Sequence, residues 1–511
     1  MENTKSAEAA GFEPPALSKS NLWSFSLGCV GRDMAYVLFN SFLLTFVLYT
    51  KGLTESQFAV LSGIIVAARI FDALNDPIMG MIVENTRSKF GRFKPWILIG
   101  AVTCSLVIFG MFSGGLYGWE FVVYFGIFYF LFSITFTMND ISYWGMIPSL
   151  AGRENDRNRL TSMTVLCASA GAAAVGALVP IFTVGGMAIG GNAGEAYIVV
   201  AAVTGAIFIA CQTMTVLRVK EPKLAAAPPQ KVSVKEMLSI IFKNDQVLWI
   251  SLISLLYNVG NLVFSTVVNS VYIYFEFGYD GSLITVVGIL GAAASVAVNV
   301  FFPKLNVKLT KRQLIRASMC CIAAGYALMI AVATLMTATT PAIASPKLWA
   351  VAFANGLILF GQSMFYIITM VTFANTVEYN EWKTGERRES IIFTLRPFMA
   401  KLGSALMQAV VSVIYIAAGV LTYTNKIADI EREAGLKLIT DEQKAQGIKE
   451  VLNSVTSQNQ DVLIICSCAV AAVLIAGAYI LYQKKIKITE AFYKQMAKEI
   501  AEKKQAQPAA D

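Results

Sequence analysis

The chain has 511 residues, of which 56% are hydrophobic and 14% are charged, with a mean hydropathy of +0.60. A soluble globular protein does not carry that much apolar surface, and repeated apolar runs longer than about 18 residues predict transmembrane helices. The net charge of +8 comes from basic residues in short loops between those runs, where they set membrane topology, so nucleic-acid binding is excluded.

Missing residue types limit the chemistry further. Histidine is absent, which excludes serine–histidine catalysis, the usual zinc ligands and a histidine proton relay. The eight cysteines nearly all lie within apolar runs and form no CxxC pair, so neither a disulfide framework nor a zinc site is indicated. No Walker A sequence is present, so no ATP-driven mechanism is indicated. We therefore expect a protein that is not an enzyme and has no cofactor.

In chain order, the apolar runs predict about twelve membrane-spanning helices. The expected spans are 23–49, 56–83, 95–116, 120–147, 160–183, 196–217, 246–275, 282–303, 312–337, 347–376, 389–421 and 461–483. A linker at 219–245, rich in proline and alanine and ending in a basic amphipathic segment, divides them six and six. The predicted fold is an all-α membrane protein with six-helix bundles at 23–218 and 246–483, and with tails at 1–22 and 484–511.

Basic residues indicate the orientation of the chain. Lysine and arginine gather in the loops after the even-numbered spans, whereas the alternate short loops contain little beyond Lys51 and Lys347. By the positive-inside rule, both termini are expected to be cytoplasmic. Segment 422–460 is long enough to escape the rule, and we expect it to form an extracytoplasmic loop with a small helical cap. The expected location is the cell (inner) membrane, in contact with lipid.

The two halves of the chain resemble each other weakly. The sequence F-N-S-F-L-L-T-F-V-L-Y-T-K-G in the first span has a counterpart in V-N-S-V-Y-I-Y-F-E-F-G in the seventh. In secondary transporters built from two repeats, the substrate site lies between the repeats. The same location is expected here.

Two carboxylates lie inside the second apolar run. Asp72 and Asp76 are four residues apart, so on a helix they lie one above the other at about 6 Å, with Asn75 close to the same face. They should repel by about 3 kcal/mol at an effective dielectric constant of about 20. Carboxylates within a membrane usually mark an ion pathway, so we expect this pair to hold a proton or a small cation. The alternative is a structural carboxylate neutralised by Arg69.

Further polar side chains fall within the first, fourth and eleventh spans, namely Asp33, Asp140, Arg396 and Lys401. In the fourth span, Thr137, Asp140 and Trp144 lie on one face at near-helical spacing. A carboxylate beside an indole ring suits a sugar, because the acid accepts hydrogen bonds from hydroxyls and the ring covers an apolar sugar face. Trp144 is alternatively an interfacial anchor near the end of its span.

Arg396 suggests an anionic substrate. It lies five residues before Lys401, just ahead of Pro397, in an apolar span where an arginine is costly unless it is paired. Its planar guanidinium suits a carboxylate or a sulfonate. A salt bridge to Asp33 or Asp140 explains the arginine almost equally well.

Two motifs resemble a known family. D-A-L-N-D-P-I-M-G followed by N-T-R-S-K-F-G-R-F-K-P-W, and the later stretch N-T-V-E-Y-N-E-W-K-T-G-E-R-R-E-S, are similar to signatures of the glycoside-pentoside-hexuronide:cation symporters. This group includes the melibiose permease and belongs to the major facilitator superfamily. The resemblance extends over nearly all twelve predicted spans and implies the major facilitator fold.

The resemblance also implies roles for single residues. The family's sugar site matches Asp33, Asp140 and Trp144. Its cation site matches Asp72, Asn75, Asp76 and Thr137, and Lys401 matches a coupling lysine between the two sites. With Arg396 and Lys401 added, the predicted substrate-binding residues are Asp33, Asp140, Trp144, Arg396 and Lys401. If sodium is the coupling ion, Asp72 and Asp76 would be its carboxylate ligands. Three positions depart from the melibiose permease, namely Phe136, Val165 and Arg396, so melibiose is not the expected substrate.

Together these features predict a secondary active transporter. It would move a glycoside or sugar acid into the cytoplasm with co-transported Na⁺ or H⁺, by alternating access and as a monomer. Two alternatives remain, a cation-coupled lipid-type carrier of the same fold and an uncoupled sugar facilitator or sensor. The polar face of Asp33, Asp140 and Trp144 favours a sugar over an acyl chain.

Overall fold

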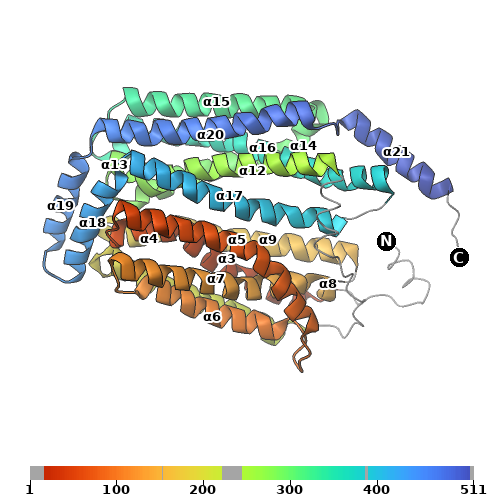
Figure 1. Cartoon of the computed structure of the whole chain (residues 1–511), viewed down its shortest axis with the longest axis horizontal. Coiled ribbons are helices and arrows are strands. Elements are labelled where there is room, and N and C mark those ends of the chain that lie inside the picture. The colour runs from red at the N-terminus through yellow and green to blue at the C-terminus, as the bar shows by residue number, and fades with distance from the viewer. Residues whose placement is uncertain (1–16, 152, 221–243, 386–388, 507–511) are drawn as a thin grey trace. The chain divides into compact units, whose positions relative to one another are not determined.

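The computed structural model describes residues 17–151, 153–220, 244–385 and 389–506. All regular structure in these residues is helical (Figure 1). Most of the predicted N-terminal tail, nearly all of the predicted linker with its amphipathic segment, and the end of the C-terminal tail lie outside the described residues.

The helices of the first half begin and end close to the predicted spans. The first span consists of α2 (Lys19–Ser26), α3 (Gly28–Val37), the π-helical turn η1 (Leu38–Phe42) and α4 (Leu43–Thr50). It is followed by α5 (Glu55–Asn85), α6 (Lys94–Ser113), α7 (Gly118–Gly145), the short α8 (Ile147–Leu150), α9 (Glu154–Thr183), the 3₁₀ turns η2 (Gly185–Met187) and η3 (Ile189–Gly191), and α10 (Ala193–Arg218).

The second half repeats this arrangement. Its first span consists of α12 (Asp245–Val267), the π-helical turn η4 (Val268–Tyr272) and α13 (Ile273–Phe277). It is followed by α14 (Gly281–Lys308), α15 (Lys311–Leu335), η5 (Ala342–Ala344), α16 (Pro346–Thr384), α17 (Glu389–Ala417), α18 (Val420–Gly435), α19 (Asp441–Asn453), α20 (Ser457–Lys485) and α21 (Glu490–Ala506).

Within the described residues, eleven helical segments are long and apolar enough to cross a membrane. The second predicted span corresponds to α5, which is 31 residues long and continues without interruption past Pro77. This is the helix on which Arg69, Asp72 and Asp76 lie. A capping box starts it, because the Thr54 hydroxyl accepts from the backbone of Gln57 while the Gln57 side chain accepts from the backbone of Thr54.

The weak sequence repeat has a structural counterpart. The matched N-S pairs, Asn40-Ser41 and Asn269-Ser270, both fall within π-helical turns, η1 and η4. A π turn inserts one extra residue into a helix, shifts the side chains that follow and is frequent at functional sites. The first helix of each half therefore carries the same irregularity at the matched position.

Contacts between residues divide the chain into two units. Unit 1 comprises Met1–Gln57, Phe71–Pro229 and Ile427–Ala445. Unit 2 comprises Phe58–Ile70, Gln230–Lys426 and Gln446–Asp511. The units thus follow the two halves of the chain, except that part of α5 belongs to unit 2 and parts of α18 and α19 belong to unit 1.

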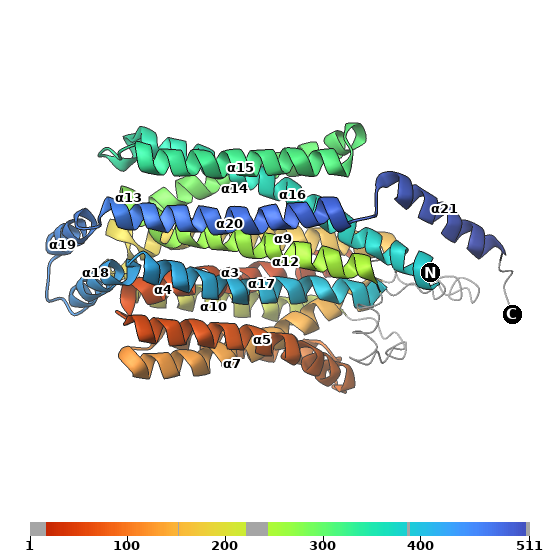
Figure 2. The ribbon, with the colours of Figure 1, turned by 45° about the horizontal axis from the view of Figure 1, so that its top comes forward.

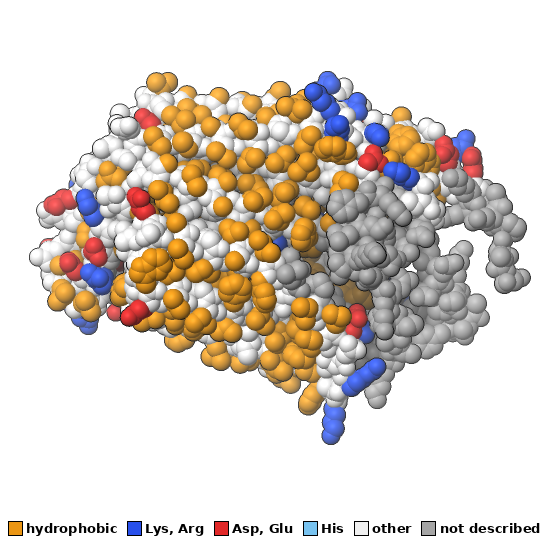
Figure 3. Space-filling model, viewed as in Figure 1, with side chains coloured by type: hydrophobic (Ala, Val, Ile, Leu, Met, Phe, Trp, Pro, Cys, Tyr) orange, Lys and Arg blue, Asp and Glu red, His pale blue; other side chains and the backbone are white. Residues whose placement is uncertain are grey.

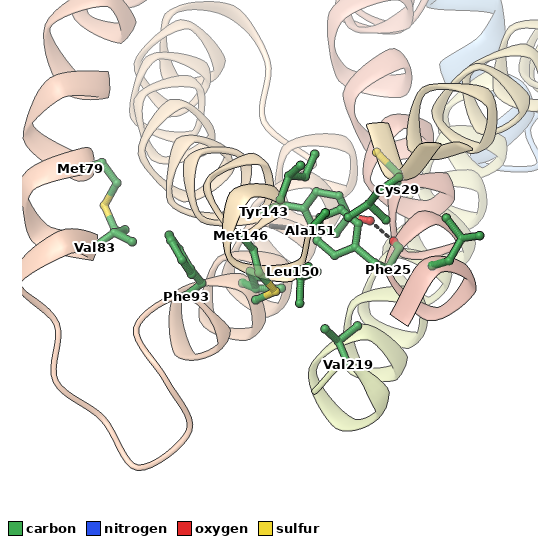
Figure 4. Packing of buried hydrophobic residues seen from close by; sticks show 14 residues of the cluster. Phe25, Cys29, Met79, Val83, Phe93, Tyr143, Met146, Leu150, Ala151 and Val219 are labelled. Carbon is green, nitrogen blue, oxygen red and sulfur yellow. Dashed lines mark hydrogen bonds between the residues drawn. The ribbon is translucent and has the colours of Figure 1, made fainter. Parts of the chain in front are cut away.

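In unit 1, α3 packs against α9 and α10, and α6 packs against α7 and α10. The approach of α3 to α10 requires glycine, because a Cβ on Gly31 would lie 2.7 Å from the Cα of Phe208. A cluster of buried apolar side chains in the same unit includes Phe25, Tyr143 and Met146 (Figure 4). This packing fixes the first helix against its neighbours.

In unit 2, α12 packs against α17 and α20, and α16 packs against α14 and α15 (Figure 2). Over α15, α20 and α17 the visible side chains are mainly hydrophobic, as expected of a lipid-facing surface (Figure 3). The segment Phe58–Ile70 also contacts α17, where Gln408 donates to Ser62 Oγ at 3.3 Å and the rings of Phe58 and Tyr415 lie 6.4 Å apart. The last described helix, α21, packs against α16.

The predicted helical cap in segment 422–460 is confirmed as helical, in α18 and α19. Within unit 1, Glu431 Oε2 accepts from the backbone N–H of Ala193, the first residue of α10, at 2.7 Å. Lys444 donates to Glu431 at 2.9 Å and to the carbonyl of Gly191 at 2.8 Å. The Glu431 and Lys444 side chains are only 2% and 7% exposed, so this is a buried ion pair.

The two lysines of the sparsely charged loops are also buried. Lys51 is 5% exposed and donates to the carbonyl of Gly114 at 2.6 Å, while its ammonium lies 4.8 Å from the ring centroid of Phe121. Burial lowers the pKa of Lys51 to about 8. Lys347 is 3% exposed and pairs with Glu276 at 2.6 Å. Both lysines therefore stabilise contacts between segments rather than project into solvent.

Candidate functional site

Arg32 joins two of the predicted substrate-binding carboxylates. On α3, its Nη2 donates to Asp33 Oδ2 at 2.8 Å and its Nε donates to the same oxygen at 3.1 Å. Its Nη1 donates to Asp140 Oδ1 on α7. Arg32 is 5% exposed, whereas the side chains of Asp33 and Asp140 are 19% and 39% exposed. A buried guanidinium therefore holds together two partly accessible carboxylates from different helices.

Aromatic rings complete this cluster. The guanidinium carbon of Arg32 lies 5.0 Å from the ring centroid of Trp144 and 5.6 Å from that of Tyr143, both on α7. Cations at this distance are attracted to the faces of aromatic rings. The structure thus brings Asp33, Asp140 and Trp144 together around one arginine, and the predicted carboxylate-and-indole pair lies within this group.

Buried hydrogen bonds hold the backbone of the first span in place at the end of α2 and the start of α3, ahead of Arg32 in the chain. Gln212 on α10 donates to the carbonyl of Gly28 at 2.8 Å. The hydroxyl of Tyr143 donates to the carbonyl of Phe25, and the two rings stack with centroids 4.3 Å apart (Figure 4). Because these groups are buried, each unmade bond would carry the full desolvation cost of its polar partner. The position of Arg32 is therefore fixed from two neighbouring helices.

The predicted cation site forms a matched pair of contacts between α5 and α7. Ser133 donates to Asp72 Oδ1, and Thr137 donates to Asp76 Oδ1 at 3.3 Å. Both pairs use a spacing of four residues, so two carboxylates on one helix face two hydroxyls on the other. Asp72, Ser133 and Thr137 are 7%, 3% and 4% exposed. Asn75 lies on α5 between the carboxylates, and its Nδ2 is buried without an acceptor among the described residues.

Arg396 and Lys401 lie on α17 in unit 2. Arg396 is exposed, and its Nη2 donates to the hydroxyl of Tyr366 on α16 at 2.7 Å. Lys401 is half-buried, and its backbone carbonyl accepts from Ser404 at 2.8 Å. The predictions that Arg396 binds an anion and that Lys401 couples the two sites stay predictions.

Two of the positions that depart from the melibiose permease also lie in described helices. Phe136 on α7 packs against Tyr36 on α3, with ring centroids 5.2 Å apart. Val165 on α9 is 48% exposed. An apolar side chain therefore stands at both positions.

A family model described as MFS/sugar transport protein matches residues 24–489. The chain belongs to this family. The match covers every described membrane helix except part of the first, and it confirms the predicted superfamily and the predicted fold. The protein is therefore a multi-pass membrane protein of the major facilitator superfamily.

Individual relatives agree with this assignment. The lactose permease of Lactobacillus helveticus is 28% identical over 414 residues, which cover 78% of this chain and 62% of the permease. The chain thus matches less than two thirds of that relative's length. The inner membrane symporter YicJ of Escherichia coli is 25% identical over 393 residues, which cover 75% of this chain and 80% of the symporter. A crystal structure of a D-xylose-proton symporter has a similar fold, with a TM-score of 0.55 at 12% identity, over 83% of this chain and 98% of that chain.

Sequence reasoning missed two residues of the candidate site. Arg32 lies inside an apolar span, so the criterion that singled out Arg396 would have found it as well. Ser133 lies four residues before Thr137, which repeats the spacing of Asp72 and Asp76. That match could have predicted a second hydroxyl in the cation site.

Proposed function

We propose that the protein is a symporter that carries a glycoside or sugar acid together with Na⁺ or H⁺ across the cell (inner) membrane into the cytoplasm. Both termini would be cytoplasmic, as the distribution of basic residues indicates. The names of the relatives, a lactose permease and an inner membrane symporter, support a sugar as substrate and symport as mechanism.

The observation that carries this proposal is that one helix, α7, contributes to both candidate sites. Ser133 and Thr137 contact the carboxylates of α5, while Asp140 and Trp144 contact Arg32 on α3. Thr137 and Asp140 are three residues apart, which is about 4.5 Å along a helix. A cation that moves α7 against α5 would therefore also move the groups that face the sugar.

The chemistry of the cluster around Arg32 suits a sugar. Asp33 and Asp140 can accept hydrogen bonds from hydroxyls, Arg32 can donate to a ring or hydroxyl oxygen, and the Trp144 indole can cover an apolar sugar face. Because Arg32 pairs with both carboxylates, a sugar would exchange part of this ion pairing for its own hydrogen bonds. An acyl chain would satisfy none of these charged groups, which favours a sugar over a lipid substrate.

Coupling would follow from charge neutralisation. A cation entering among Asp72, Asn75, Asp76 and Thr137 would remove a carboxylate repulsion of about 3 kcal/mol. Lys401, which matches the coupling lysine of the resembled family, is the further residue proposed to take part in coupling. Linkage requires that the sugar tighten cation binding by the same factor, about 5- to 150-fold for a coupling of about 1 to 3 kcal/mol.

Uptake into proteoliposomes tests this proposal, with lactose and methyl β-D-glucuronide as probes and with an imposed Na⁺ or H⁺ gradient. We expect one gradient to drive accumulation of one probe above equilibrium. Asp140→Ala should weaken binding of the transported sugar probe at least tenfold, because hydrogen bonds to a charged group contribute about 1.5 to 3 kcal/mol each. The matched control is Asp429→Ala, at a carboxylate on α18 that is 59% exposed. Probe entry that only equilibrates, with or without a gradient, would instead support an uncoupled facilitator.

A further inference from the structure

We propose that Ser133 is a ligand of the co-transported cation and makes the site selective for a metal cation, with Na⁺ as the natural candidate, over a proton. This inference deepens the proposed symport and rests on it. It concerns a residue that neither the sequence motifs nor the family resemblance singled out.

The geometry supports a ligand position. Ser133 lies one helical turn before Thr137 on α7, and its hydroxyl donates to Asp72 as that of Thr137 donates to Asp76. Ser133 is 3% exposed and Asp72 is 7% exposed, so this end of the site is more enclosed than a surface pair. The two carboxylates lie on α5 and the two hydroxyls lie on α7, so each of the two facing helices contributes two oxygen-bearing side chains.

A hydroxyl in this position has two functions at once. It has one proton to donate and two lone pairs with which to accept, so Ser133 can donate to Asp72 and still offer an oxygen to a cation. A hard cation takes several oxygen ligands, and carboxylate, hydroxyl and amide oxygens are of the kind it prefers. A proton needs a single oxygen and gains nothing from a further ligand.

A side chain without an oxygen at this position would remove one ligand of a metal cation, whereas the carboxylate oxygens that can accept a proton would remain.

The test compares Ser133→Ala with Ser142→Ala in the full-length protein. Ser142 is also fully buried on α7, but its hydroxyl donates to the carbonyl of Met138 in its own helix, so the same substitution there leaves the site unchanged. Binding of NaCl and LiCl would be measured by calorimetry without sugar at constant ionic strength. Proton-driven uptake of the probe sugar would be measured separately, in sodium-free buffer.

We expect Ser133→Ala to weaken Na⁺ affinity at least tenfold while proton-driven uptake stays the same, and we expect Ser133→Thr to restore Na⁺ binding. Ser142→Ala should change neither quantity. Unchanged Na⁺ affinity in Ser133→Ala overturns the inference, and so does equal loss of Na⁺ binding and proton-driven uptake, which indicates a purely structural role. A wild-type protein that binds no Na⁺ but accumulates sugar with protons overturns the inference and leaves the symport proposal intact. A wild-type protein that binds Na⁺ in a Ser133-dependent way without accumulating sugar supports the cation site and contradicts symport.

Discussion

Replacing Arg32 by glutamine should destabilise the protein by about 3 kcal/mol at neutral pH. Arg32 is 5% exposed and pairs with both Asp33 and Asp140. Removing one partner of a buried ion pair costs about 3 to 5 kcal/mol, because the charge left behind is buried without compensation. The lower end applies here, since the Asp140 side chain is 39% exposed and water screens part of its charge.

The assay is unfolding by SDS titration in mixed micelles at pH 7.5, for Arg32→Gln and for the double variant Arg32→Gln/Asp140→Asn. We expect the double variant to recover more than half of the loss at pH 7.5, because it leaves one carboxylate instead of two. Arg432→Gln, at an arginine that is 45% exposed, is the control and should have little effect. The reasoning is refuted if Arg32→Gln is as stable as wild type at pH 7.5, or if Asp140→Asn fails to improve it.

Three further predictions concern other charged groups. Lys444→Met should loosen α18 and α19, because it leaves the buried Glu431 carboxylate without the ammonium that offsets its charge, at a cost of about 3 to 5 kcal/mol. Hydrogen exchange in these helices should become faster in Lys444→Met and slow again in Lys444→Met/Glu431→Leu; unchanged exchange in the single variant would contradict the prediction. The free energy of unfolding should rise between pH 8 and pH 10 by up to about 3 kcal/mol. The pKa of Lys51 is about 8 in the folded protein, so in this range the unfolded chain binds more protons at Lys51 than the folded protein does. Thermal unfolding should show this rise in wild type and its absence in Lys51→Met, and parallel pH curves would refute it. Asp72→Asn and Asp76→Asn should each abolish uphill sugar accumulation while leaving some binding or exchange; a variant that still concentrates sugar with unchanged cation dependence would exclude that carboxylate from the coupling site.

Local sequence patterns predicted the helices and part of the site. Span length follows from the thickness of the hydrocarbon core, so apolar runs located the membrane helices to within a few residues in most cases. The four-residue spacing of Asp72 and Asp76 predicted a shared face because helical periodicity is a local property. The near-helical spacing of Thr137, Asp140 and Trp144 was informative for the same reason.

Contacts between helices were not predictable in this way. The partner of Ser133 is on α5, 61 residues away in sequence, and no periodicity within α7 points to it. Lys51 and Lys347 were interpreted as loop lysines, but their partners are a carbonyl and a carboxylate from other segments. In each case the partner is supplied by the tertiary fold.

The arrangement along α7 also constrains how coupling can work. Ser133, Thr137, Asp140 and Trp144 share one continuous helix, and a helix transmits displacement between adjacent turns because successive backbone hydrogen bonds link them. The groups of the candidate cation site contact α5 and those of the candidate sugar site contact α3, so a change at either contact would alter the position of α7 at the other. Allostery requires an element with differential contacts in two states, and α7 is the element of unit 1 that both candidate sites contact directly. If the protein is a symporter as proposed, coupling would need only a small movement of one helix. Arg32 and the two carboxylate–hydroxyl pairs would be the groups whose contacts differ between the positions of that helix.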